Sequence, residues 1–296
     1  MLKPLTRAAA ALALLFAPLA HAQQAPLKDA DPALWVVKDR DTTIYLFGTV
    51  HVLKPGLGWF DEAVKKAFDR SRQVMLEIVE PDAATMEGLL IKLGMDANGP
   101  TISSQLPPDK LAAYRKILAE LGAPVESYDH FKPWLPAVAI SVGLLPKYGY
   151  DPQSGAEKVI AAAAKAAGKP LGGLETAEQQ LGYFASLPRD RQLVFLEQTI
   201  DQVPDTAATL DQMVASWAKG DVRTLGIAMN KDVAGMPDMA RILLTERNAR
   251  WATWIAKRMR RPGTVFLAVG AGHLAGPNSV QAFLEKHHLH AMRINY

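Results

Sequence analysis

The chain contains no cysteine, and few of its residues are aromatic. None of its 296 residues is cysteine and only 7% are Phe, Trp or Tyr. The absence of thiols excludes disulfide bonds, thiolate zinc sites and cysteine nucleophiles, so any metal ion must be held by His, Asp or Glu. Apolar residues make up 49% of the chain and charged residues 21%, which excludes a disordered tail and a membrane protein with many spans.

Residues 1–22 have the pattern of a secretory signal. Lys3 and Arg7 precede a short apolar run, and the segment ends in Ala-His-Ala, which matches the small-x-small cleavage rule. The apolar run is too short to anchor the chain in a bilayer. We therefore expect export, most simply to a bacterial periplasm, and a single mature domain over 23–296 with no membrane anchor after cleavage.

The charge balance of the mature chain points away from nucleic acid. Removing the signal removes two of the 33 basic residues and none of the 30 acidic ones, which leaves a net charge of about +1. We expect no nucleic-acid partner.

Both ends of the mature chain have the same plan. A strand-like run ends in Gly-x-x-His, and a Gly/Pro loop, an amphipathic helix and a second strand follow. This order predicts an α/β fold in which two related βαβ halves, about 34–80 and 262–296, form a central sheet. The residues between them, about 82–261, read as a large and mostly helical insertion that includes a short strand near 170–174.

The two Gly-x-x-His motifs supply the first candidate site residues, His51 and His273. Ligands of parallel α/β sheets collect at the carboxyl ends of the strands, where both histidines fall. Two neutral imidazoles brought together there can bind a divalent metal ion. The alternative is that each histidine only caps its own strand by hydrogen bonding.

Three further charged residues stand out. Glu77 lies in the apolar run 74–79, where a buried carboxylate is costly unless it is paired or bound to a cation, although a period-two pattern could face it to solvent. Glu175 ends the short strand of the insertion. Arg247 lies on a predicted helix, where it either belongs to a salt-bridged surface or faces a developing oxyanion. Spacing alone does not choose between these two roles.

Several familiar catalytic motifs are absent from the sequence. There is no His-Glu-x-x-His, no Gly-x-Ser-x-Gly, no P-loop and no Gly-x-Gly-x-x-Gly after a strand. A standard zincin, an α/β-hydrolase nucleophile elbow and the common nucleotide sites are therefore excluded.

The ordered set of motifs resembles the TraB/GumN family, which includes the TIKI proteins. The resemblance covers the chain from about residue 34 to its end. It is carried, in order, by Phe47-Gly48-Thr49-Val50-His51, Leu76-Glu77, Lys132-Pro133-Trp134, Gly173-Leu174-Glu175-Thr176, Glu246-Arg247-Asn248 and Val269-Gly270-Ala271-Gly272-His273.

The resemblance implies a fold shared with erythromycin esterase and ChaN-like proteins, and a site around the two histidine motifs. Because animal TIKI proteins are metal-dependent proteases, it also implies that His51 and His273 are metal ligands and that Glu77 is a catalytic or ligating carboxylate. Glu175 and Arg247 would support the site, with Arg247 at the oxyanion.

The sequence therefore predicts an exported metal-dependent hydrolase, a peptidase that acts on peptides or secreted proteins. Imidazole and carboxylate ligands suit Mn, Co and Zn about equally. Two alternatives stay open. One is a periplasmic protein that binds or sequesters a ligand without turnover, and the other is a metal-free, esterase-like hydrolase with a histidine as general base.

Overall fold

A computed structural model describes residues 27–234 and 237–296, with the side chains of Val125 and 230–234 left out. The signal expected at residues 1–22 lies outside the described residues. In the part of the chain that the structure describes, no helix is both long enough and apolar enough to cross a membrane.

A mixed six-stranded sheet forms the centre of the fold, in the order β6-β5-β7-β3-β2-β8. The four strands from β6 to β3 run parallel, whereas β2 is antiparallel to both β3 and β8. The α/β class is confirmed. The strands are β2 (Leu34–Lys38), β3 (Thr42–Thr49), β5 (Gln73–Leu76), β6 (Leu171–Gly173), β7 (Gly263–Gly270) and β8 (Met292–Ile294).

Two crossovers leave the central strand pair, β3 and β7, in opposite directions. The first runs from β3 through α1 (Glu62–Arg70) to β5, and the second from β7 through α13 (Val280–Glu285) to β8. The first passes over one strand and the second over two. Chain paths that diverge from neighbouring parallel strands create a topological switch point, where α/β proteins bind ligands.

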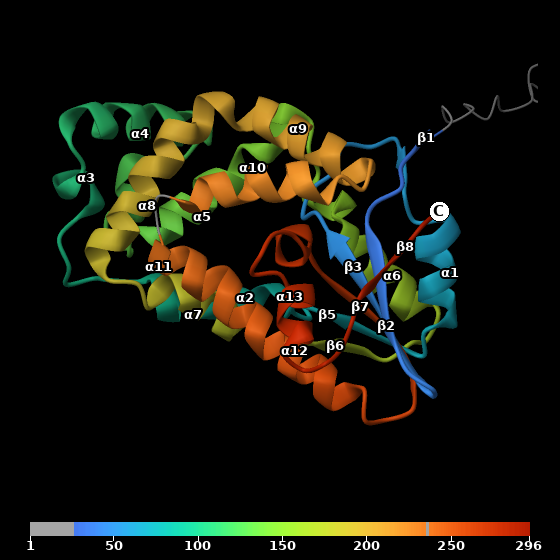
Figure 1. Cartoon of the computed structure of the whole chain (residues 1–296). Helices are drawn as coiled ribbons and strands as arrows, with labels where there is room; N and C mark the ends of the chain where they lie inside the picture. The colour runs from blue at the N-terminus through green and yellow to red at the C-terminus, as the bar shows by residue number, and fades with distance from the viewer. Residues whose placement is uncertain (1–26, 235–236) are drawn as a thin grey trace, which may run out of the picture.

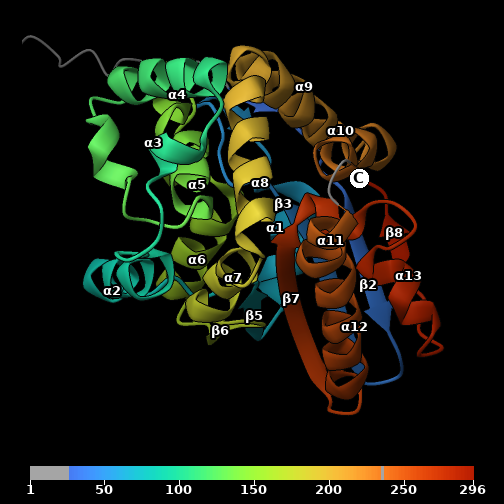
Figure 2. The same cartoon turned by 90° about the vertical axis from the view of Figure 1, so that its left-hand side faces the viewer.

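The helices of the two crossovers cover opposite faces of the sheet. Helices α1 and α6 (Ala156–Ala166) pack in one apolar cluster with Phe47 and Phe266, whereas α12 (Glu246–Arg258) and α13 pack in another with Ile44 and Leu46. Alternate residues of a strand face opposite sides, so β3 supplies both clusters. Figures 1 and 2 show the resulting layers, with α1 and α6 on one side of the strands and α12 and α13 on the other.

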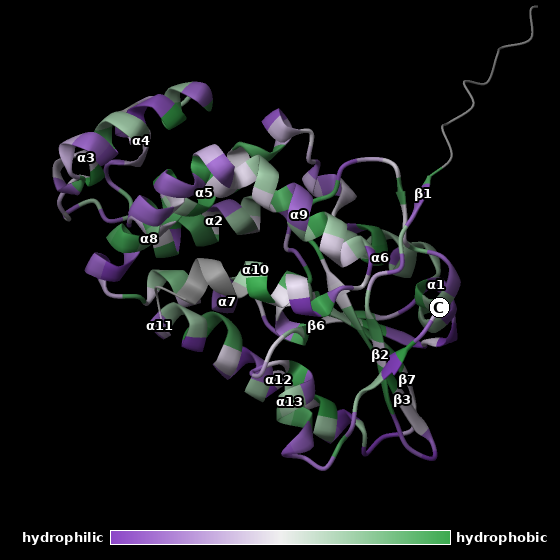
Figure 3. Cartoon of the chain, turned by 45° about the horizontal axis from the view of Figure 1, so that its top comes forward, coloured by the Kyte–Doolittle hydropathy of each residue, from purple (hydrophilic) through white to green (hydrophobic). Residues whose placement is uncertain are grey.

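The rest of the chain between β5 and β7 is mostly helical, as predicted. Most of its helices extend to one side of the sheet, where α4, α5 and α8 share a third apolar cluster (Figure 1). In Figure 3 the central strands are mainly hydrophobic, whereas the outer helices carry both colours. The helices are α2 (Ala83–Gly94), α3 (Ile102–Gln105), α4 (Pro108–Glu120), α5 (Trp134–Gly143), α6, α7 (Ala177–Ala185), α8 (Arg189–Gln202), α9 (Thr206–Ala218), α10 (Val222–Ala234), α11 (Pro237–Ala240) and α12.

Short elements complete the described residues. Strands β1 (Lys28–Asp29) and β4 (Leu57–Gly58) form a separate parallel pair, and a π-helical turn over Arg241–Thr245 leads into α12. Turns of 3₁₀ helix lie at Val125–Tyr128, Leu145–Tyr148, Pro152–Ser154, Val203–Asp205 and Ala271–Leu274.

Candidate functional site

Four of the predicted site residues follow the carboxyl ends of four parallel strands. His51 follows β3, Glu77 follows β5, Glu175 follows β6 and His273 follows β7. The sequence placed Glu77 inside a strand over 74–79, which is wrong, because β5 ends at Leu76. Just beyond the strand, the Glu77 carboxylate accepts a hydrogen bond from the Gly270 N–H at the end of β7, at 2.6 Å.

Arg247, from the first turn of α12, links three of these residues. Its Nε group donates to both Glu175 oxygens, NH2 donates to Glu77 Oε2 at 2.6 Å, and NH1 donates to His273 Nε2 at 3.1 Å. The second N–H of NH1 donates to the Leu243 carbonyl in the π-helical turn, at 3.1 Å. Four of the five guanidinium N–H groups thus donate to acceptors within the protein, and NH2 also forms an ion pair with Glu175 Oε2 at 2.9 Å. The alternative that Arg247 belongs to a surface ion-pair cluster is wrong, because the side chain is buried.

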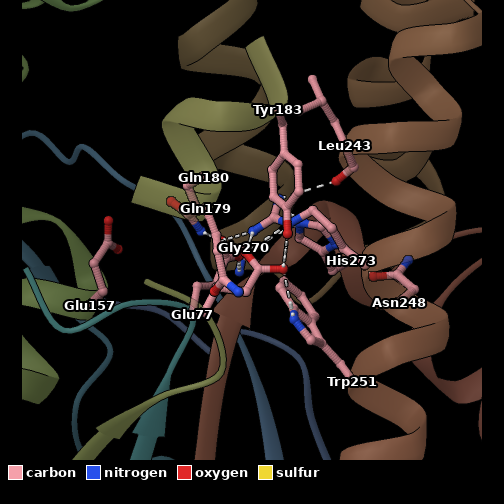
Figure 4. A network of polar contacts seen from close by, with 12 residues as sticks. Glu77, Glu157, Gln179, Gln180, Tyr183, Leu243, Asn248, Trp251, Gly270 and His273 are labelled. Atoms are coloured by element: carbon pink, nitrogen blue, oxygen red, sulfur yellow. Dashed lines mark hydrogen bonds and ion pairs between the residues drawn. The ribbon is translucent and has the colours of Figure 1, made fainter. Parts of the chain in front are cut away.

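Glu175 is the buried counter-ion of this arginine. Besides Arg247, its carboxylate accepts hydrogen bonds from Tyr183 Oη and Trp251 Nε1, both at 3.1 Å, and from Gln180. Helix α7 begins directly after Glu175 with a capping box between Thr176 and Gln179, which places the next helical turns over the carboxylate. Figure 4 shows Tyr183, Trp251 and Gln180 pointing into one network of polar contacts together with Glu77 and His273.

Glu77 is held ionised by its surroundings. Its side chain is 13% exposed, and it accepts hydrogen bonds from Gly270 N, Arg247 and Gln180 Nε2. Burial by itself would raise the pKa of Glu77, but neighbouring His273 and Arg247 together with the Gly270 N–H outweigh burial and lower the pKa to about 2. Of the two orientations that the sequence left open, the solvent-facing one is wrong, because the carboxylate is largely shielded and paired with Arg247. A side chain at position 270 would bring a Cβ within 3.0 Å of the Glu77 carboxylate, so this approach requires glycine.

His273 is buried and its tautomer follows from its partners. Arg247 can only donate, so His273 Nε2 accepts, and the ring proton lies on Nδ1, which donates to Asn248 Oδ1 at 2.6 Å. Asn248 is itself oriented because its Nδ2 donates to the Asn278 carbonyl. Burial lowers the pKa of His273 to about 3 against the opposing charge of Glu77, so the imidazole is neutral at physiological pH.

His51 lies in a different environment from His273. Its side chain is 72% exposed and its Nδ1 is hydrogen-bonded to Glu157 Oε1 near the start of α6. The close packing of Gly155 against the His51 carbonyl and the bond from Ala156 N to the Val50 carbonyl fix this loop beside α6. The hydrogen bond to Glu157 raises the pKa of His51 to about 9.

The two histidines nevertheless border one hollow. A cavity of about 290 Å³ is lined by His51, Glu77, Gln180, Arg247 and His273, among others. A larger cavity of about 660 Å³ adjoins it and shares His51, Glu77 and Gln180. The structure thus brings all five predicted site residues to one place, with Glu77, Glu175, Arg247 and His273 in direct contact and His51 at the rim.

A metal ion would find two of its expected ligands close together here. Glu77 Oε1 and His273 Nε2 lie 3.6 Å apart, near the roughly 3.3 Å that separates two ligands on one Zn²⁺ at about 2.1 Å from each. Within 27–234 and 237–296, no three His, Asp or Glu side chains are close enough to share an ion. His51, the third expected ligand, contacts Glu157 instead.

Three residues of the site carried no catalytic assignment from the sequence. Asn248 orients His273, and its position next to Arg247 in the quoted motif was the only signal for it. Glu157 and Gln180 lie on α6 and α7, in polar stretches of helix that look like ordinary surface. Their roles depend on where the helices pack, which local sequence does not encode.

The fold and the site define an α/β protein with a buried His–Arg–carboxylate network at the switch point of its sheet. Residues 33–291 match the model of the TraB/PrgY/gumN family, and the chain belongs to this family. Among curated proteins it is similar to an uncharacterized protein of Treponema pallidum (strain Nichols), with 23% identity over 86% of this chain and 80% of that protein. It is also similar to the uncharacterized protein YbaP of Escherichia coli (strain K12), with 23% identity over 86% of this chain and 92% of YbaP. No solved structure matches the chain.

Proposed function

We propose that this protein is an exported, metal-dependent hydrolase that cleaves peptide bonds in the hollow between His51 and His273. One observation carries the proposal: each histidine uses Nδ1 to bind an oxygen acceptor, Glu157 or Asn248, which leaves Nε2 as the nitrogen for a ligand. Histidines that bind metals are oriented in this way by a second hydrogen bond. The expected export depends on the pattern of residues 1–22. The proposal also includes the predicted relationship between the two βαβ halves.

The donor types fit a divalent cation. Two imidazole nitrogens and the Glu77 carboxylate suit Mn, Co or Zn, and Glu77 already balances positive charge from Arg247. His273 Nε2 accepts from Arg247 in this structure, so a metal on that nitrogen would replace the Arg247 contact. Arg247 keeps its bonds to Glu175 when that single contact is lost.

The residues of the site then have separate roles in hydrolysis. A bound divalent ion would supply an activated water by lowering its pKa towards about 7. Glu77 completes the ligand set or accepts the proton of that water. His51, exposed at the rim and oriented by Glu157, would give the ion a further ligand through Nε2, for which its ring must be neutral.

Arg247 and Glu175 have a positioning role in this proposal. Arg247 is held by Glu175, Glu77, His273 and the Leu243 carbonyl, and the second N–H of its NH2 group, near Glu175 Oε2, is left for the oxyanion role predicted from the sequence. Glu175 likewise accepts from four side chains, so it holds the arginine and leaves no oxygen directed at a substrate.

The test is metal content measured together with turnover. Purified protein and the His51→Ala/His273→Ala double variant are soaked in Mn, Co and Zn, desalted, and assayed by elemental analysis and with a fluorogenic peptide library. We expect about one equivalent of metal and chelator-sensitive cleavage in the parent, and neither in the folded double variant. Absence of retained metal together with absence of cleavage would refute the proposal. A rise in melting temperature with a peptide but without product would then support the ligand-binding alternative.

A metal-free hydrolase is the second candidate, because the His51–Glu157 pair also has the form of a general base oriented by a carboxylate. Cleavage that survives the chelator but disappears in Glu157→Gln would favour it. Because Glu157→Gln leaves the hydrogen bonds around His273 intact, this variant distinguishes the metal-free hydrolase from the metal-dependent one.

A further inference from the structure

The larger cavity is continuous with the proposed catalytic hollow. It measures about 660 Å³ and shares His51, Glu77 and Gln180 with the smaller hollow of about 290 Å³. A ligand that reaches the histidines therefore has the larger cavity beside it. The volume falls in the range of about 300–1,000 Å³ that is typical of ligand pockets.

The walls of this cavity are mostly apolar. The sheet side is formed by residues that end or follow β5 and neighbouring strands: Leu76, Ile78, Val79, Leu171 and Ala268. Val79 is 46% exposed, which leaves a large apolar side chain open to the cavity. Apolar surface of this kind next to a site marks a place where an apolar partner binds.

Helix α6 forms the opposite wall and leaves the space open. The cavity-lining residues of α6 include Ala161 and Ala162, whose small side chains lie between Lys158 and Lys165 of the same helix. Lys158 is paired with Glu80, and Lys169, just beyond the helix, donates to the Ser71 and Asp69 carbonyls. The Lys158 and Lys169 ammonium groups are thus held by the protein itself, whereas Lys165 lines the cavity from an exposed position, and the two alanines form the apolar part of this wall.

The edge of the sheet favours an extended peptide as the occupant. Among the described residues, strand β6 is an edge strand that pairs with β5 alone, and it borders the cavity through Leu171. Its other two residues, Gly172 and Gly173, are closely approached by Met75 and by the backbone of Ile78 and Val79, which brings the apolar residues after β5 against this edge. An extended segment can lie along such an edge and place alternate side chains in a pocket.

We propose that this cavity is the specificity subsite of the enzyme and takes a large apolar side chain, of the Leu, Met or Phe kind, next to the cleaved bond of a peptide. This inference rests on the proposed function for its catalytic part. The alanines of α6 set the size of the accepted side chain, and Val79 with the β5 end supplies the apolar contact.

The experiment fills the cavity without touching the catalytic residues. Ala162→Trp places a bulky ring in the hollow, whereas Ala166→Trp makes the same change one turn later on α6, at an exposed position that does not line the cavity. Val79→Ser reduces the apolar wall without adding bulk. For every variant we measure binding of the neutral dye N-phenyl-1-naphthylamine. We also measure how the metal-loaded protein cleaves matched peptides that carry Phe or Ser at each position in turn.

We expect the parent and Ala166→Trp to bind the dye saturably and to cleave one Phe peptide at least tenfold better than its Ser counterpart. Ala162→Trp should weaken dye binding at least tenfold and reduce the Phe preference to below threefold through KM, and Val79→Ser should lie between. Cleavage with no preference for Phe, or with a preference unchanged in Ala162→Trp, would refute the proposed specificity subsite but not the proposed hydrolase activity. No cleavage, with dye binding lost only in the cavity variants, would refute the hydrolase but retain the cavity as an apolar binding site.

Discussion

His51 and His273 occupy equivalent places in the chain and opposite environments in the fold. Each follows Gly-x-x at the end of a central parallel strand. His273 has 7% of its side chain exposed, contacts the Trp251 ring with centroids 4.4 Å apart, and is bound by an amide. His51 has 72% exposed and is bound by a carboxylate.

The partner of each imidazole decides what that imidazole can do. The amide oxygen of Asn248 accepts a hydrogen bond but carries no negative charge that would stabilise an imidazolium. Buried His273 therefore stays neutral, and its Nε2 acts as a hydrogen-bond acceptor. A carboxylate stabilises the imidazolium, so His51 can carry a proton near neutral pH. One repeated motif thus produces a neutral acceptor nitrogen on β7 and, on β3, an imidazole that must give up a proton before its Nε2 can bind a metal.

The largest effect is expected from breaking the network that holds His273. Arg247→Ala leaves Glu77 and Glu175 buried without their counter-ion, and loss of one partner of a buried ion pair costs about 3–5 kcal/mol. Arg250 is the matched control, because it is half exposed and lies 3.8 Å from the same Glu175. Urea denaturation of both alanine variants measures the difference.

For Arg250→Ala we expect a loss below about 1 kcal/mol, as for exposed pairs in general. Equal losses in the two variants would mean that the buried network contributes no more than surface charge. The structural basis for treating Arg247 as the residue that organises the His273 side would then be gone.

The sequence alone predicts part of the structure around the two histidines. The repeated strand, helix and strand patterns at the two ends of the chain give β3, α1 and β5 and then β7, α13 and β8, and the short strand expected near 170–174 is β6. The periodicity also places both histidines at strand ends. These features are encoded by neighbouring residues, which is why local patterns reveal them.

What decides the difference between the histidines is not local. Glu157 lies 106 residues from His51, and Gln180 lies 103 residues from Glu77. No spacing rule connects them, because their meeting depends on how α6 and α7 pack over the sheet. The same holds for Arg247, since its partner Glu175 is 72 residues away.

A smaller effect should separate the two histidines themselves. His273→Ala removes a buried ring and leaves Asn248 Oδ1 and one N–H of Arg247 without the hydrogen bond that each makes to the ring, which costs about 2–4 kcal/mol by analogy with other buried truncations. His51→Ala should cost less than about 1 kcal/mol, because its ring is mostly exposed. Thermal unfolding followed by circular dichroism compares the two variants in one buffer. Similar melting temperatures would show that the burial of His273 does not distinguish it energetically.

The smallest and sharpest test is the opposite pH response of the two rings. The pKa of His51 is raised to about 9, so its pairing with Glu157 stabilises the fold fully below the unfolded pKa of about 6.5 and less as pH rises through 9. The pKa of His273 is lowered to about 3, so its contribution is present above about 6.5 and is lost as pH falls from there towards 3.

NMR titration of the imidazole carbons reads both rings directly. We expect the His51 signal to titrate above pH 6.5 and to move towards about 6.5 in Glu157→Gln, which keeps a hydrogen-bond acceptor but removes the charge. The His273 signal should stay that of a neutral Nδ1–H ring between pH 5 and 9 in both proteins. Because Glu157→Gln changes only the partner of His51, a His51 pKa that does not respond would show that the carboxylate is not what separates the two motifs.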